Sequence, residues 1–127
     1  MEASAPFVHH LGVFASDFEA SQRFYTAVLK PLGITARYRA GGVVEHWSPE
    51  RDTPSLSLER AENASATTRR MHIAVTAGSR EALNAFRAAA VMGIFENGRG
   101  RSSPPLAWPL NCVRRVGIEE QSSITRM

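Results

Sequence analysis

The feature that most constrains this chain is an internal repeat. The interval that separates His10 from His72 also separates Phe24 from Phe86, and it separates Asp17 from Ser79. Matches at one interval indicate a duplicated strand–helix unit. A unit this small cannot bury its own sheet face. We therefore expect the two units to pack together around a pseudo-twofold axis, with equivalent residues of the two first strands approaching each other.

Alternating and helical hydrophobic patterns divide the first unit into elements. Residues 7–14 read as a strand, followed by a helix that either Ser16 or Asp17 can cap. Pro31 and Gly33 end that helix, and Gly and Pro mark the turns between the segments that follow. The pattern predicts three further short strands, at residues 34–39, 43–47 and 55–60.

The second unit restarts the pattern but does not complete it. Residues 71–76 read as a strand, and Ser79 can cap a helix that ends at Gly93. The segment that follows contains Pro104, Pro105 and Pro109, which oppose central strands. Only residues 111–118 form a plausible strand there, so we expect an incomplete or atypical second module.

Composition excludes several classes of function. The chain of 127 residues carries a net charge of +3, and its positive excess lies in residues 97–127. The body has no basic stripe interleaved with aromatic residues, so we predict no nucleic-acid partner. No apolar run is long enough to cross a membrane, so we predict no membrane partner either. Cys112 is the only cysteine, which fits a cytoplasmic location.

His10 and His72 are the candidate functional residues. A single strand histidine is usually a structural residue, but a pair related by the repeat favours metal ligation. His9 points to the other sheet face by strand alternation, and we interpret it as structural or exposed.

The stretch from His10 to Gly33 resembles the opening of a known superfamily. It reads His10-Leu-Gly-Val-Phe-Ala-Ser-Asp17, then Phe24-Tyr25, and it closes with Leu32-Gly33. Such a strand histidine with a Ser-Asp cap, a Phe-Tyr pair and a Leu-Gly ending is similar to the vicinal oxygen chelate (glyoxalase, bleomycin-resistance and extradiol dioxygenase) superfamily. The resemblance covers residues 7–101, including the strand around His72.

The resemblance implies an α+β fold of paired βαβββ modules that form a cup around a divalent metal. It implies one domain over residues 1–127. In this division residues 7–68 are the first module, residues 69–101 start the second, and residues 102–127 form an atypical tail.

Metal-binding members of the superfamily take their ligands from the first, fourth, fifth and eighth strands, which implies His10 and His72 as ligands here. Glu119 is the implied third ligand, with Glu120 as an alternative. Glu59 is a candidate for a catalytic base or a ligand. The metal would be Fe, Mn, Ni or Zn.

The implied function is a metal-dependent lyase, isomerase or dioxygenase that acts on a small substrate with two adjacent oxygens. A metal-free protein that binds small molecules is the alternative, with Trp47, Tyr25 or Trp108 stacking on the ligand; for Tyr25 we favour a place in the core. A third reading is an inactive fragment whose last segment reflects a changed reading frame. A homodimer is a further expectation.

Overall fold

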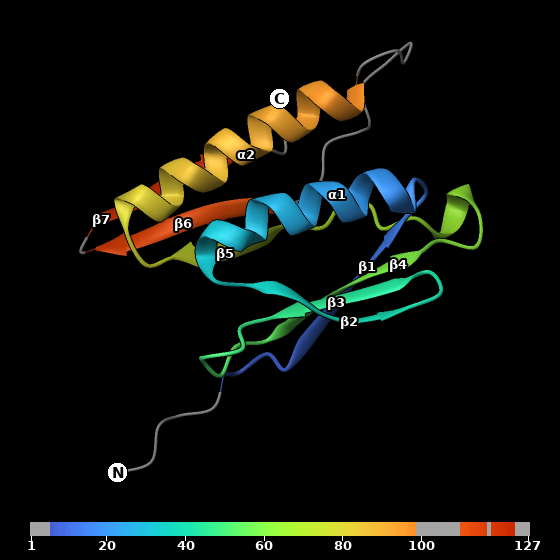
Figure 1. The fold of residues 1–127 in the computed structure, drawn as a ribbon, viewed down its shortest axis with the longest axis horizontal. Helices are drawn as coiled ribbons and strands as arrows, with labels where there is room; N and C mark the ends of the chain where they lie inside the picture. The colour runs from blue at the N-terminus through green and yellow to red at the C-terminus, as the bar shows by residue number, and fades with distance from the viewer. Residues whose placement is uncertain (1–5, 99–109, 117, 124–127) are drawn as a thin grey trace.

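The computed structural model describes residues 6–98, 110–116 and 118–123, with side chains described for residues 6–92. It is an α+β structure with two sheets and two long helices (Figure 1). No helix in these ranges is long and apolar enough to cross a membrane.

The first module is a complete βαβββ unit. It contains β1 (His10–Ala15), α1 (Phe18–Leu29), the short 3-10 helix η1 (Lys30–Leu32), β2 (Thr35–Ala40), β3 (Val43–Trp47) and β4 (Ser55–Arg60). The strand order is β1-β4-β3-β2, with β1 parallel to β4 and the other neighbours antiparallel. The predicted strands and helix of this unit are confirmed within a few residues at their ends.

The second module is partial, as predicted. The 3-10 helix η2 (Ala64–Ala66) precedes it, and it contains β5 (Ile73–Ala77), α2 (Arg80–Gly98), β6 (Leu110–Val116) and β7 (Ile118–Ser123). β6 lies parallel to β5 as β4 does to β1, and β7 lies antiparallel to β6. Within the described ranges, this sheet has no strand in the position that β2 occupies in the first module.

Two predictions about the second module are wrong. The helix does not end at Gly93 but continues to Gly98. A helical glycine costs only about 1 kcal/mol, and Leu83, Phe86 and Ala90 hold this helix in the core. The segment predicted as one strand, residues 111–118, instead contributes to two paired strands on either side of residue 117.

Both long helices begin at side-chain caps. The Asp17 carboxylate accepts a hydrogen bond from the Ala20 amide at 3.2 Å, and the Ser79 hydroxyl accepts one from the Ala82 amide at 3.0 Å. Of the two predicted caps for α1, the structure therefore uses Asp17. These caps satisfy amides that have no partner within the helix.

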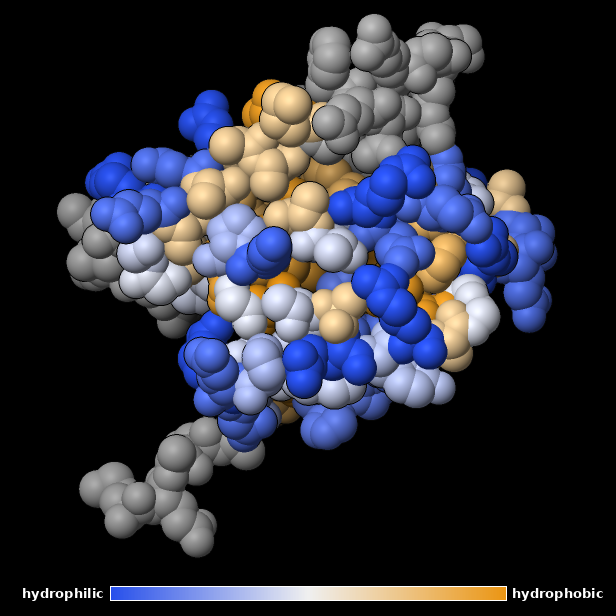
Figure 2. Space-filling view, viewed as in Figure 1, coloured by the Kyte–Doolittle hydropathy of each residue, from blue (hydrophilic) through white to orange (hydrophobic). Residues whose placement is uncertain are grey.

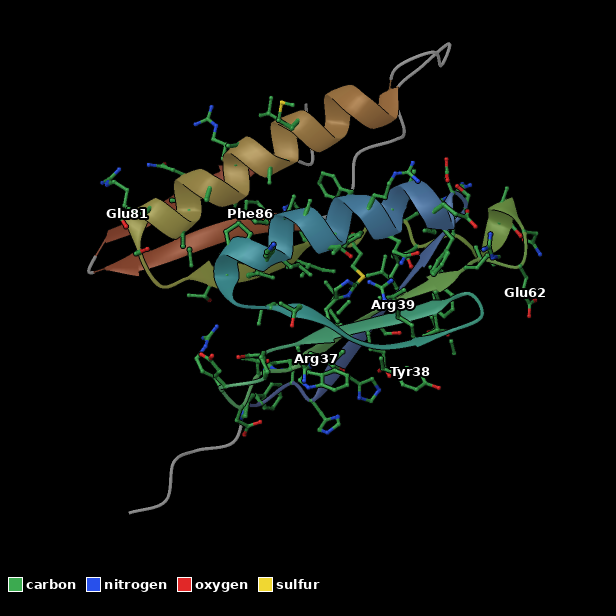
Figure 3. All side chains as sticks on the ribbon, viewed as in Figure 1. Arg37, Tyr38, Arg39, Glu62, Glu81 and Phe86 are labelled. Carbon is green, nitrogen blue, oxygen red and sulfur yellow. The ribbon has the colours of Figure 1, made fainter. Side chains whose placement is uncertain are left out.

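The modules share one hydrophobic core. α1 lies between α2 and the four-stranded sheet (Figure 1). Phe86 points from α2 toward α1 (Figure 3) and has no exposed surface. Tyr25 is 1% exposed, which confirms that it belongs to the core and excludes it as a ligand-stacking residue. Hydrophilic residues cover much of the rest of the surface in this view (Figure 2).

Candidate functional site

The face of the four-stranded sheet that points away from α1 carries two of the predicted site residues, His10 and Glu59, and we call it the open face. Val13 and Ala15 of β1 are buried beneath α1, whereas His10 and Phe14 are exposed on the other side. The register places His10 beside Ser55, and Phe14 beside Glu59. Directly paired residues share a sheet face. His10 and Glu59 therefore belong to the open face together.

Gly12 leaves space between His10 and Glu59. A side-chain carbon built on Gly12 would lie 3.6 Å from Oε2 of Glu59. The Glu59 carboxylate thus leans along the sheet over Gly12, in the direction of His10. In the next strand, Glu45 pairs with Ser57, which itself pairs with Gly12. The open face therefore presents two carboxylates and an imidazole on three adjacent strands.

The His10 ring is oriented by its neighbour. Nδ1 of His10 lies 2.9 Å from Nδ1 of His9, and the two ring planes are nearly perpendicular at 86°. One Nδ1–H donates to the other nitrogen in this contact, so the Nδ1 of His10 is engaged. Among the described residues, the side chain of His10 forms this hydrogen bond with His9. A histidine held through Nδ1 presents Nε2 outward, as metal-binding histidines do. His9 is exposed, as interpreted from the sequence, but the prediction that it points to the other sheet face is wrong. It precedes β1, so strand alternation does not apply, and its ring contacts His10 and lines the same cavity as Glu45 and Trp47.

His72 is exposed and directly precedes β5. The chain that leads to it is fixed to β1 by two hydrogen bonds between Thr68 and Phe14. The Thr68 amide donates to the Phe14 carbonyl at 2.9 Å, and the Phe14 amide donates to the Thr68 hydroxyl at 2.8 Å.

This bridge has a simple consequence for register. Thr68 precedes His72 by the same number of residues as Phe14 follows His10. An antiparallel continuation from the bridge would therefore put His72 opposite His10. Arg70 has a φ of 54°, so the backbone leaves the extended conformation between the bridge and His72. No hydrogen bond or ring contact joins His10 to His72 in the described part of the chain.

Glu119 and Glu120 lie in β7, paired with Arg115 and Arg114 of β6. Since Arg114 pairs with Ala77, both glutamates lie level with the end of β5, whereas His72 precedes its start. At about 3.3 Å per residue, the positions of Glu119 and His72 are separated by about 20 Å along the strands. Among the residues that the structure describes, no three His, Cys, Asp or Glu side chains are grouped closely enough to hold a metal ion.

A cavity of about 370 Å³ opens beside the same face. Its walls include Glu45, Trp47, Ser55, Asp52 and His9. Trp47 is therefore available to a ligand, while Trp108 lies outside the described residues. Sequence analysis did not single out Glu45. Alternation along residues 43–47 could have grouped it with Trp47, but only the register shows that this group faces the same side as His10.

His46 lies on the opposite side of the sheet, beneath α1. It is fully buried, with Nδ1 3.1 Å from the Leu56 carbonyl oxygen and Nε2 3.3 Å from the Thr26 hydroxyl. Burial lowers its pKa, and the positive charge of Arg39 lowers the pKa further, while the Leu56 carbonyl opposes both effects. Both ring nitrogens have protein partners, so His46 serves the fold rather than a ligand.

Comparison with solved structures identifies the fold. A glyoxalase/bleomycin resistance protein from Albidiferax ferrireducens aligns with a TM-score of 0.61 and 25% identity, over 70% of this chain and 73% of that one. A candidate glyoxalase from Bacillus halodurans aligns with a TM-score of 0.60 and 17% identity, over 86% of this chain and 96% of that one. No protein-family model and no curated protein matches the sequence.

Proposed function

We propose that this chain, which has a glyoxalase-like fold, is a member of the vicinal oxygen chelate superfamily and binds a small oxygen-rich molecule at a divalent metal ion held by His10 and His72. The Thr68–Phe14 bridge is the observation that carries the proposal. It ties the chain before His72 to the edge of β1 at a point equally far in sequence from the two histidines, which supports a shared site.

The residue types of the donor set suit such an ion, although binding would have to bring His72 closer to His10 and Glu59. Two neutral imidazoles and a carboxylate suit Fe, Mn, Ni or Zn. His10 is already oriented through Nδ1, and the Glu59 carboxylate extends over Gly12 on the same face. A bound ion would supply Lewis acidity toward a substrate that chelates through two adjacent oxygens.

Glu59 has two roles open to it in this site. It would either complete the ligand set or hold a proton at Oε2 as the general base. Glu119, with Glu120 as its alternative, is the third ligand implied by the sequence, but its separation from His72 along the strands favours Glu59 for the first of these roles. Beside them, Trp47 would form an apolar wall for the organic part of the substrate.

Metal analysis of the purified chain tests the proposal. We expect one divalent ion per chain, lost in His10→Ala and in His72→Ala but retained in Glu62→Ala, an exposed control outside the site. Because His9 orients the His10 ring, His9→Ala should weaken metal binding. Glu59→Gln and Glu119→Gln separate the two candidate ligands, because only the true ligand weakens metal binding. If Glu59 is the base, Glu59→Gln keeps the metal but loses lyase, isomerase or dioxygenase turnover.

A metal-free binding protein is the second candidate, and the cavity beside Trp47 favours it. In a Trp108→Phe variant, Trp47 is the remaining indole, and its fluorescence reports on that cavity. Quenching by small aromatic ligands in metal-stripped protein, with no metal requirement, would support this candidate over the first. Cytoplasmic location and a homodimer remain predictions of the sequence.

A further inference from the structure

A second cavity, of about 420 Å³, lies on the side of the sheet that faces the helices, where the two modules meet. Its apolar walls come from both modules: Leu11 of β1, Leu29 of α1, Leu32 of η1, Leu56 of β4, and Ile73 and Val75 of β5. Figure 2 shows apolar surface reaching the outside below the C-terminal end of α1, framed by hydrophilic residues. We call this space the junction cavity.

The size and apolar lining of the junction cavity point to a ligand. A space of this volume falls in the range of small-molecule sites, about 300–1,000 Å³. Its leucine and isoleucine walls offer water few hydrogen-bond partners, so ordered water would be poorly held there. Replacing that water with an apolar molecule would therefore give a favourable binding free energy.

Arg51 supplies a cationic group at the mouth of this cavity. Its Nη2 donates to the Leu32 carbonyl oxygen at 2.8 Å and lies beside Gly33. A guanidinium has five N–H donors, so this contact leaves most of them available. No carboxylate forms an ion pair with Arg51 among the described residues.

Asp52 lies at the same mouth and opposes the charge of Arg51. A bound anion would therefore be attracted by Arg51 and repelled by Asp52. This pair of opposing charges gives two substitutions whose effects on anion binding have opposite sign.

We propose that the junction cavity binds a small amphipathic carboxylate, with its hydrocarbon chain among Leu11, Leu56 and Ile73 and its carboxylate at Arg51. A chain of roughly six to ten carbons fits the volume. The cavity lies on the helix side of the sheet, whereas His10 and Glu59 lie on the opposite face. Its rim shares Asp52 and Ser55 with the cavity beside Trp47, but its apolar walls are separate from the proposed metal ligands.

Calorimetry with octanoate, octanol and acetate tests this assignment. We expect octanoate to bind wild-type protein, octanol to bind at least tenfold more weakly, and acetate not to bind. Arg51→Met should lower octanoate affinity about tenfold and leave octanol affinity unchanged. Asp52→Asn should raise octanoate affinity. No octanoate binding, or equal binding of octanoate and octanol in wild type, would overturn the proposal.

A second experiment fills the cavity with a larger side chain. Ala74 is exposed and lines the cavity, so Ala74→Trp should abolish octanoate binding without removing a core side chain. Ala40→Trp, at an exposed strand position outside the cavity, is the matched control and should bind normally. Circular dichroism verifies folding, and Thr76→Phe replaces the first variant if it fails to fold. Unchanged octanoate affinity in a folded blocking variant would also contradict the assignment.

Discussion

His46 and His10 illustrate how placement alone decides what a histidine can do. His46 is fully buried, has a protein partner at each ring nitrogen, and has a pKa lowered chiefly by burial. His10 is exposed, and its neighbour His9 engages only Nδ1 among the contacts described. The first histidine is a neutral part of the core, and the second has a ring nitrogen to offer a ligand.

The lowered pKa of His46 makes stability depend on pH. The folded state keeps His46 neutral, whereas the unfolded chain protonates it near its ordinary value of 6.5. The contribution of neutral His46 to the free energy of unfolding is therefore complete above pH 6.5. It falls as the pH drops below that value, by up to about 1.4 kcal/mol per pH unit.

Urea unfolding at pH 7.5 and pH 5.5 measures this pH dependence of the free energy of unfolding. His46→Gln, which keeps a hydrogen-bonding side chain but cannot titrate, should lose less stability between the two pH values than wild type. Equal losses would contradict the assignment.

Thr68 tests the bridge between the modules. Thr68→Val keeps the shape and the backbone hydrogen bond to Phe14 but removes the hydroxyl that accepts from the Phe14 amide. We expect a loss of about 0.5–1.5 kcal/mol in unfolding free energy. We also expect metal affinity to fall severalfold, because the register of His72 loosens. Thr67→Val is the neighbouring control and should keep wild-type metal affinity. A loss of stability with unchanged metal affinity would contradict a role of the Thr68–Phe14 bridge in positioning His72.

Individual elements were predictable where local signals agree with tertiary packing. The first module follows its alternation and turn residues closely, from the Asp17 cap to the turn at Gly33, whose φ is 77°. The end of α2 was not predictable, because Gly93 is a stop signal that core contacts of the preceding turns override.

The candidate site was likewise predictable where sequence signals alone suffice, and not where it depends on how strands pair. The internal repeat identified His10 and His72, because it needs no knowledge of strand pairing. Glu45 and Trp47 could be assigned to the same sheet face as His10 only once the register of β3 against β4 was known. The position of Glu119 depended on how the tail pairs, which its prolines obscure in the sequence.

Helix caps give an element-level test. Asp17→Ala and Ser79→Ala should each lower unfolding free energy by about 1 kcal/mol, because each leaves a helix amide without its side-chain acceptor. Ser16→Ala is the matched control, since the structure caps α1 with Asp17, and it should change stability by less than about 0.5 kcal/mol. Thermal denaturation monitored by circular dichroism measures all three. A larger effect of Ser16→Ala than of Asp17→Ala would contradict the assigned cap.

The molecule as a whole is held together by a core that both modules share. Phe24 and Val28 of α1 belong to the same buried cluster as Phe86 and Ala90 of α2. A chain with such a core should unfold as one unit. Uncooperative unfolding would instead support the reading of this sequence as a fragment.

Phe86 tests this cooperativity. Phe86→Ala should lower the free energy of unfolding by about 3–5 kcal/mol while leaving a single transition. Met92→Ala on the same helix, where the side chain is 57% exposed, should cost less than about 0.5 kcal/mol. Chemical denaturation followed by far-ultraviolet circular dichroism and by tryptophan fluorescence measures both variants. Two separate transitions in wild type would contradict a shared core.

The central claim is that His10 and His72 hold one divalent metal ion where β1 meets the chain that leads into β5. Its most direct measurement is the metal content of the purified protein by mass spectrometry, for wild type, His10→Ala, His72→Ala and the exposed control Glu62→Ala. The account predicts one ion per chain in wild type and Glu62→Ala, and none in the other two variants. Folded wild-type protein that binds no divalent metal, or that keeps its metal in both His10→Ala and His72→Ala, would contradict it.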